Sequence, residues 1–263
     1  MSVKDQINMG EAVTLHPLEY RYLVNAANLV TWLGAQTAEL RVTGRGIEFF
    51  AMKSLNIPKW RFHVVIGRPR QAPGHAITAH PGKIAGALHI AGAPGPRRYS
   101  YTDVYFGNGV ARFIGPDGTT EISGRVTAAG SDRSAIPRDV KPLARMFVGR
   151  DDLTNGVLLA LARSPDVEMR MSQVEGNRWK LHIISMADDD YDFFVNIYKP
   201  PEVEFRGLYK AWTLSELLAP VGDYAMLGFF GSADYPALHA YWDGILRDRE
   251  GSAPVTTEFY LKG

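Results

Sequence analysis

Apolar residues follow two different spacings along the chain, and their order predicts a mixture of helices and strands. Between Leu18 and Leu33 they recur close to the helical period, so we expect a helix there that Gly34 ends. A short apolar run at Ala12–His16 precedes this helix. Runs with the pattern of strands follow it at Glu39–Thr43, Ile47–Met52 and Arg61–Ile66. The first segment therefore predicts a strand, a helix and three strands.

The same order of elements returns three more times. Helices are expected at Gly82–Ile90, Arg150–Ala162 and Ala211–Leu218. The expected strands are Ala76–Ala79, Tyr99–Phe106, Val110–Ile114, Thr119–Val126, Ala144–Val148, Val167–Gln173, Arg178–Met186, Tyr191–Ile197, Glu202–Leu208, Tyr224–Phe230, Pro236–Asp243 and Val255–Leu261. The chain is thus predicted to contain four units of one kind.

Units one and three also match as sequences, which indicates duplicated domains. The stretch AELRVTGRGIEFFAMKS, from Ala38, resembles VEMRMSQVEGNRWKLHIISMA, from Val167. A polar stretch rich in Gly, Ser and Pro separates the halves. We therefore predict an α+β protein with an N-terminal domain over 1–127, a connecting loop over 128–143 and a C-terminal domain over 144–263. Each domain would hold two of the strand–helix–strand–strand–strand units.

The composition excludes several classes of protein but does not point to a particular function. The 263 residues include 46% hydrophobic and 22% charged residues with a net charge of +1, values typical of a globular protein without a global attraction to nucleic acid. The absence of cysteine excludes disulfide scaffolds, thiol nucleophiles and Cys-ligated zinc. No apolar stretch is long enough for a membrane helix, and the N-terminus has no signal core. We expect an intracellular protein with no membrane association.

The polar residues form no convincing catalytic constellation. The seven histidines lack the HExxH spacing of zinc enzymes, and the Gly-rich stretches do not join a strand to a helix as a phosphate loop requires. No Ser/His/Asp arrangement is evident from spacing. Clustered oxygens at Asp188, Asp189 and Asp190 could hold a cation, with His182 nearby, although a solvated hairpin loop is the favoured explanation. We predict no cofactor, no metal and no enzymatic activity, and keep a metal-dependent hydrolase as the rival.

Several stretches resemble sliding clamps of the proliferating cell nuclear antigen (PCNA) type. GIEFFAMKSLNI, from Gly46, is similar to the family's strand that ends in Met before a loop. LGFFGSADYPALHAYWD, from Leu227, is similar to the final hairpin, and AIPRD, from Ala135, resembles part of the interdomain connecting loop. FYLKG, from Phe259, is similar to the last strand, without the family's Ala-Pro-Lys ending. The four-unit organisation extends the resemblance over the whole chain.

The resemblance implies a DNA clamp fold and a non-enzymatic function. Subunits, usually three, would form a ring around duplex DNA with their helices lining the hole, acting as a processivity factor in DNA replication and repair. DNA polymerase, flap nuclease, ligase and clamp loader would dock short PIP-box peptides on the outer face. Exposed strand edges can pair between subunits, and we expect the edge near Thr119–Val126 to pair with the one near Tyr191–Ile197 of a neighbour.

The resemblance also assigns two sets of site residues. The partner-peptide pocket would be formed by Met52, Asn56, Ile57, Ile136, Tyr235, Pro236 and Leu261. The DNA-facing cations would be Arg21, Lys83, Arg150, Arg163 and Lys210. Lys83 follows the family's basic position in GKI, whereas the other four are placed by the helix assignments.

The weakly basic helices depart from the family pattern. Phosphate contacts depend on Lys and Arg, so a ring of this subunit alone would hold DNA weakly. A homotrimer, a heterotrimer and a checkpoint-type clamp subunit therefore stay open, as does an archaeal or viral origin. The expected location is the cytoplasm or nucleoid for an archaeal protein and the nucleus for a eukaryotic one.

Overall fold

The structure is a computed structural model in which the chain forms two compact units. It describes residues 13–53, 60–67, 75–92, 101–107, 109–116, 118–128, 140–185, 190–220, 222–234, 236–248 and 251–262. Unit 1 comprises residues 1–52, 63–133 and 244–256, and unit 2 comprises 53–62, 134–243 and 257–263.

The order of elements confirms the four predicted units. The first half of the chain contains β1 (Val13–Leu15), α1 (Pro17–Trp32), β2 (Ala38–Thr43), β3 (Gly46–Lys53), β4 (Trp60–Ile66), β5 (His75–Ala79), α2 (Pro81–Ala91), β6 (Thr102–Gly107), β7 (Val110–Gly115), β8 (Gly118–Ser123) and β9 (Arg125–Ala128). Then follow β10 (Pro142–Gly149), α3 (Arg150–Leu161), β11 (Asp166–Gln173), β12 (Trp179–Ser185), β13 (Asp190–Lys199), β14 (Gly207–Lys210), α4 (Ala211–Leu218), β15 (Tyr224–Phe230), β16 (Ala237–Asp248) and β17 (Gly251–Leu261). Only β9 is added to four repeats of strand, helix and three strands.

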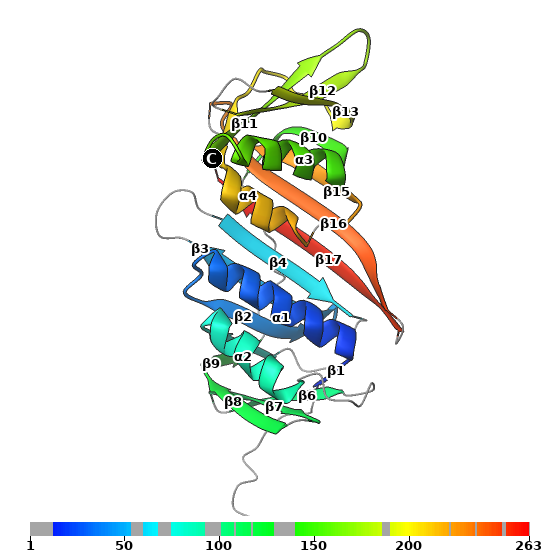
Figure 1. Ribbon diagram of the computed structural model, residues 1–263. Helices are drawn as coiled ribbons and strands as arrows, with labels where there is room; N and C mark the ends of the chain where they lie inside the picture. Colours follow the sequence, from blue (N-terminus) through cyan, green and yellow to red (C-terminus); the bar gives the residue numbers. More distant parts are fainter. Residues whose placement is uncertain are drawn as a thin grey trace, which may run out of the picture. The chain divides into compact units, whose positions relative to one another are not determined.

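In unit 1, α1 and α2 lie side by side over the strands (Figure 1). One sheet has the order β1-β6-β7-β8, and a second series runs β3-β2-β5-β9. Local chemistry sets the ends of α1. His16 accepts a hydrogen bond from a first-turn N–H while Glu19 accepts one from the His16 N–H, and Gly34 adopts φ +80° just after the helix.

In unit 2, the strands follow the order β14-β11-β12-β13-β10-β15-β16, with α3 and α4 packed together on one face. A Cβ on Gly156 of α3 would lie 2.6 Å from Ile183 and 2.8 Å from Tyr191. These two side chains therefore face the helices. Because side chains alternate across a strand, the neighbouring positions of β12 and β13 point to the opposite, helix-free face.

Two expected strands are divided or displaced in the structure, and two others are longer than expected, since β16 runs to Asp248 and β17 begins at Gly251. The run Thr119–Val126 is divided at Gly124 between β8 and β9, which lie in different sheets. A Cβ at Gly124 would lie 2.5 Å from the carbonyl oxygen of Thr78, so this close backbone approach requires glycine there. The expected strand Glu202–Leu208 begins only at Gly207, and residues before it run irregularly beside the turn at 231–234, where the Arg206 N–H donates to the Ala233 carbonyl at 3.2 Å.

Replacing Gly115 should destabilise unit 1, because α2 ends directly against this residue. A Cβ on Gly115 would lie 1.8 Å from the carbonyl oxygen of Ala91, the last residue of α2. Gly115→Ala should lower the free energy of unfolding by about 2 kcal/mol, the usual cost of overpacking. Gly118→Ala is the matched control, since no atom lies within 4 Å of its Cβ position. Equal urea midpoints for the two variants would contradict this packing.

Candidate docking surfaces, helical face and strand edges

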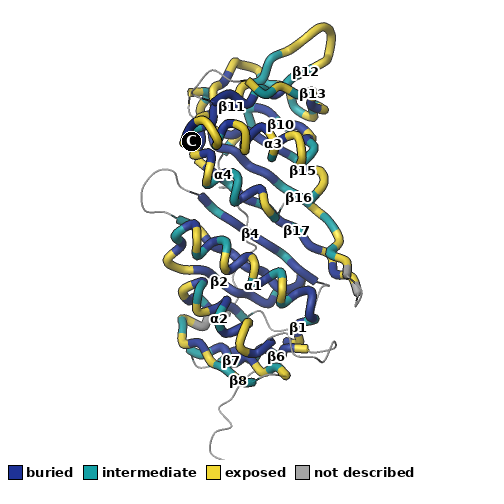
Figure 2. Tube along the Cα trace, in the orientation of Figure 1, coloured by how far each residue is buried: buried dark blue, intermediate teal, exposed yellow. Residues whose placement is uncertain are grey.

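The predicted DNA-facing cations lie on or next to the helices. Arg21 of α1, Lys83 of α2, Arg163 after α3 and Lys210 before α4 are exposed, and Arg150 at the start of α3 is half-buried. Figure 2 shows exposed stretches on the helices that contain or adjoin these residues. Lys210 is paired with Asp166 at 2.7 Å, and the Arg21 Nε donates to the Pro17 carbonyl of its own helix. The predicted DNA-facing cations are therefore scattered over the helices as single charges and do not form a cluster.

Sequence reasoning missed the apolar character of the exposed helix surface. Trp32 is 77% exposed, and further large apolar side chains are exposed on the other helices: Ile90, Leu158, Leu159 and Trp212. Asp151 and Asp152 add negative charge at the start of α3. The α1 spacing could have revealed the first of these, since Arg21, Asn25, Asn28 and Trp32 recur at helical spacing away from the buried stripe.

The structure describes three of the seven predicted pocket residues. Met52, in unit 1, is 43% exposed, whereas Pro236 and Leu261, in unit 2, are buried. The other four lie outside the described residues: Asn56, Ile57, Ile136 and Tyr235. The pocket as a whole stays a prediction.

A buried tyrosine holds the backbone at Pro236. The Tyr209 hydroxyl donates to the Pro236 carbonyl at 2.9 Å, which connects β14 to the turn before β16. Burial, with a smaller contribution from the Tyr260 phenol, raises the pKa of Tyr209 well above its usual value. Burial also raises the pKa of Tyr260, against the opposing effect of Arg61. Tyr209 is therefore a neutral donor that positions this turn.

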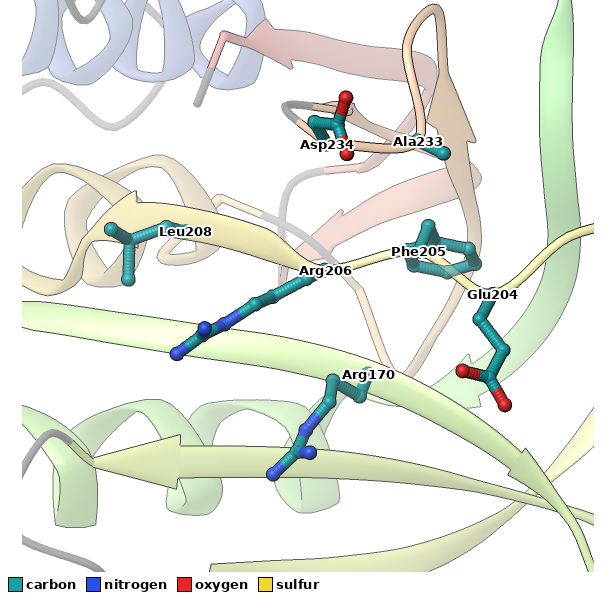
Figure 3. Close-up of a pocket in the computed structure, with 7 residues that line it drawn as sticks. All are labelled: Arg170, Glu204, Phe205, Arg206, Leu208, Ala233 and Asp234. Atoms are coloured by element: carbon teal, nitrogen blue, oxygen red, sulfur yellow. The ribbon is translucent and has the colours of Figure 1, made fainter.

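Beside that turn is a cavity of about 700 Å³ (Figure 3). Its lining combines charged and apolar side chains from β11, the start of β14, the segment before it and the 231–234 turn: Arg170, Glu204, Phe205, Arg206, Leu208, Ala233 and Asp234. Under the two arginines lies the buried carboxylate of Glu168, which accepts from Arg170 at 2.9 Å and is also ion-paired with Arg206. No sequence motif indicated this cavity.

Several strands have an unpaired edge in the described part of their units: the end strands β1, β9 and β14, and also β8 and β13. β8 pairs only with β7 in its sheet. In β13, Asp190–Val195 pairs with β12, whereas β10 pairs only with residues 196–199. β8 and β13 are the two strands predicted to join subunits, with the first shortened to Gly118–Ser123.

A hydroxyl–imidazole–carboxylate row crosses the helix-free face of unit 2. His182 bonds Ser172 Oγ through Nε2 at 2.5 Å and Asp192 through Nδ1 at 2.6 Å. The order resembles that of a serine hydrolase, but nucleophilic catalysis also needs donors for the oxyanion. Here the row lies within three strands whose backbones are paired in ladders, so the geometry indicates cross-strand positioning.

The described residues do not form a set of ligands for the metal site considered at Asp188–Asp190 and His182. Asp188 and Asp189 lie outside them, and Asp190 is an exposed residue at the start of β13. The Nε2 atom of His182 contacts Ser172 and its Nδ1 atom contacts Asp192, so both ring nitrogens already have protein partners. Among the described residues, no three His, Cys, Asp or Glu side chains come together as a metal site.

A fully buried ionic cluster lies in unit 1. Glu48 contacts Arg41 and His63 at 3.3 Å each and accepts from Thr43 at 2.7 Å. Burial acts to raise the pKa of Glu48, but hydrogen bonds from His63 and Thr43 and the charge of Arg45 outweigh it and lower that pKa to about 2. Glu48 is therefore ionised over the ordinary pH range.

Comparisons with solved structures identify the fold. No family model matches the chain, and no curated protein matches its sequence. A chain in the structure of the C-terminal region of FEN-1 bound to A. fulgidus PCNA matches with TM-score 0.61 and 11% identity, over 95% of this chain and 96% of that one. PCNA from Entamoeba histolytica matches with TM-score 0.60 and 10% identity, over 97% and 98% of the two chains.

A third match agrees with these two. PCNA from Thermococcus kodakaraensis has TM-score 0.56 and 14% identity, over 95% of this chain and 98% of that chain. The chain therefore has the PCNA-type DNA clamp fold, and the predicted resemblance in fold is confirmed. In the described part of the chain, no helix is long and apolar enough to span a membrane.

Acid should remove the stabilisation that Glu48 provides. Because its pKa is lowered from 4.5 to about 2, the contribution is complete above pH 4.5 and is lost as pH falls toward 2. Glu48→Gln should lower the free energy of unfolding by about 3 kcal/mol at pH 7, and the difference from the wild type should shrink below pH 4.5. Urea unfolding at pH 7, 4.5 and 3 measures this. Glu121→Gln, which removes a solvent-exposed partner of Arg112, should cost less than about 1 kcal/mol at every pH.

Proposed function

We propose that the chain is a subunit of a DNA sliding clamp, a non-enzymatic ring that encircles duplex DNA and docks replication and repair proteins. The observation that carries the proposal is the clamp fold over nearly the whole chain, with near-complete coverage of three PCNA chains. The unpaired edges of β8 and β13 support it, because two different edges on one subunit permit head-to-tail association that can close into a ring.

The proposed contact with DNA is electrostatic and independent of sequence. Arg21, Lys83 and Arg163 are exposed on or beside the helices, and phosphate contacts of this kind require no base readout. The anionic Asp151 and Asp152 and the exposed apolar side chains make this face less basic than phosphate binding favours. That balance favours a mixed ring with more basic sister subunits as the second candidate, including a checkpoint-type clamp.

The proposed partners are proteins that carry short docking peptides. One matching structure contains the FEN-1 C-terminal region bound to PCNA, and by analogy polymerases, flap nucleases, ligases and a clamp loader would dock here. The turn at Pro236, held by Tyr209, is one described part of the proposed pocket, besides Met52 and Leu261.

Blocking the β8 edge should convert rings into single subunits. Successive residues of a strand direct their N–H groups to opposite edges. Of Thr119 and Thr120, one therefore directs its N–H toward β7 and the other directs it toward the unpaired edge of β8. Proline at the second of these positions, Thr119→Pro or Thr120→Pro, removes an N–H from the unpaired edge and leaves the hydrogen bonds to β7 in place. That variant should keep native circular dichroism and its solution mass should fall from three subunits to one. Light scattering of each purified protein measures the change. A wild-type monomer that stays monomeric with every candidate sister subunit would contradict the ring.

A closed ring should be held on DNA by topology more than by affinity. When subunits are concentrated in the presence of a nicked circular plasmid, they should stay bound through a high-salt wash and be released after a single restriction cut. Gel filtration of labelled protein with the plasmid measures retention. Lys83→Glu should weaken initial binding and reduce its salt dependence, whereas Arg178→Glu, on the helix-free face, should not. Retention unaffected by the cut would contradict encirclement.

A further inference from the structure

The cavity beside the 231–234 turn contains an arginine pair with one uncompensated positive charge. Glu168 is buried, and its two oxygens are divided between Arg170 and Arg206. Two guanidinium groups and one carboxylate leave a net charge of +1 at this end of the cavity. Since Arg170 and Arg206 come from neighbouring segments and are held by the same carboxylate, they stay close together despite their like charges (Figure 3).

Both arginines retain donors that face the cavity and solvent. The Arg170 side chain is 54% exposed and that of Arg206 is 66% exposed. Arg170 uses Nε toward Glu168, and Arg206 uses Nε and one terminal nitrogen. A guanidinium has five N–H donors in a planar fork, so terminal N–H groups of Arg170 remain available for a second carboxylate.

The duplicated first unit shows what such a second carboxylate does. Glu39 and Arg41 are the counterparts of Glu168 and Arg170 in the repeat, and the Arg Nε to Glu distances are 3.0 and 2.9 Å. Arg41 also contacts Glu48, its cross-strand neighbour, and both of these side chains are fully buried. The cross-strand neighbour of Arg170 is instead His182, and no second carboxylate contacts Arg170 among the described residues.

Two carboxylates in the cavity lining have the reverse charge and limit where an anion can bind. Glu204 and Asp234 line the cavity and have no ion-pair partner in the described part of the chain. They repel an anion from their side, while Phe205 and Leu208 supply apolar wall. An acidic side chain on a peptide fits this distribution, because its carboxylate can bind the arginines while the peptide's N–H groups can approach Glu204 and Asp234.

The cavity adjoins the proposed docking pocket through one turn. The Arg206 N–H donates to the Ala233 carbonyl, and Tyr209 holds the Pro236 carbonyl. We propose that the Arg170–Arg206 cavity binds an acidic side chain in the segment that flanks the docking motif of a partner peptide. This inference rests on the proposed docking function and adds a charge preference to it.

Three peptides test the preference on the assembled full chain. Each contains the core Gln-x-x-aliphatic-x-x-aromatic-aromatic, flanked by three Glu before it, by three Glu after it, or by Gln on both sides. Fluorescence polarisation should show one acidic-flanked peptide binding about tenfold tighter than the Gln-flanked peptide, as one charge-assisted contact supplies. Arg170→Gln should remove this difference while leaving Arg206 to pair with Glu168. Arg170→Lys should restore part of it.

Arg178→Gln is the matched control, since Arg178 is an exposed arginine of the same unit that lies 4.1 Å from the centre of the Phe194 ring. It should keep the tenfold preference. If Arg170→Gln and Arg178→Gln reduced the preference for the acidic-flanked peptide equally, the preference would come from the general surface charge, and the proposed site would be wrong. Equal binding of all three peptides would also overturn it while the docking function stands, whereas no binding of any peptide counts against the docking function itself. A single-stranded oligonucleotide that loses binding only in Arg170→Gln would assign the cavity to nucleic-acid phosphate and overturn the peptide assignment.

Discussion

Helices cover only one face of the strands in each unit, and the other features of the molecule depend on this one-sided packing. The helix-facing side chains bury the apolar core, as the contact of Gly156 with Ile183 and Tyr191 illustrates in unit 2. The opposite positions are released from apolar packing. They are therefore available for ionic clusters, for a cavity and for contacts with other molecules, while the strand edges are available for pairing.

The helix-free face uses the same residue pair in two different ways. In unit 1, Glu39 and Arg41 join Glu48 and His63 in a cluster that is buried and structural. Burying charges is costly unless every one is paired, and in this cluster Glu48 contacts both Arg41 and His63. In unit 2 the equivalent Arg170 stays exposed at a cavity. The same Glu–Arg pair is thus part of a buried ionic cluster in one unit and lies exposed at a cavity in the other.

The charge of the helical face bears on how a ring of this subunit could hold DNA. A ring that holds DNA needs only diffuse positive charge, because encirclement replaces affinity. The sparse cations and exposed apolar side chains of these helices are compatible with such a role only when topology or sister subunits contribute. The edges of β8 and β13 are for that reason more informative about function than the charges are.

The sequence alone determined the repeated order of elements, because the signals that set it are local. The spacing of Leu18 to Leu33 and the stop at Gly34 placed α1 within about one residue, since helix ends depend on nearby caps. The clamp resemblance likewise came from short stretches, and the fold confirmed it. Only the tertiary structure decided the break at Gly124, which a carbonyl of a distant strand requires. It alone also brought Glu168, Arg170 and Arg206 around one cavity, because residues far apart in sequence meet only when their strands pair.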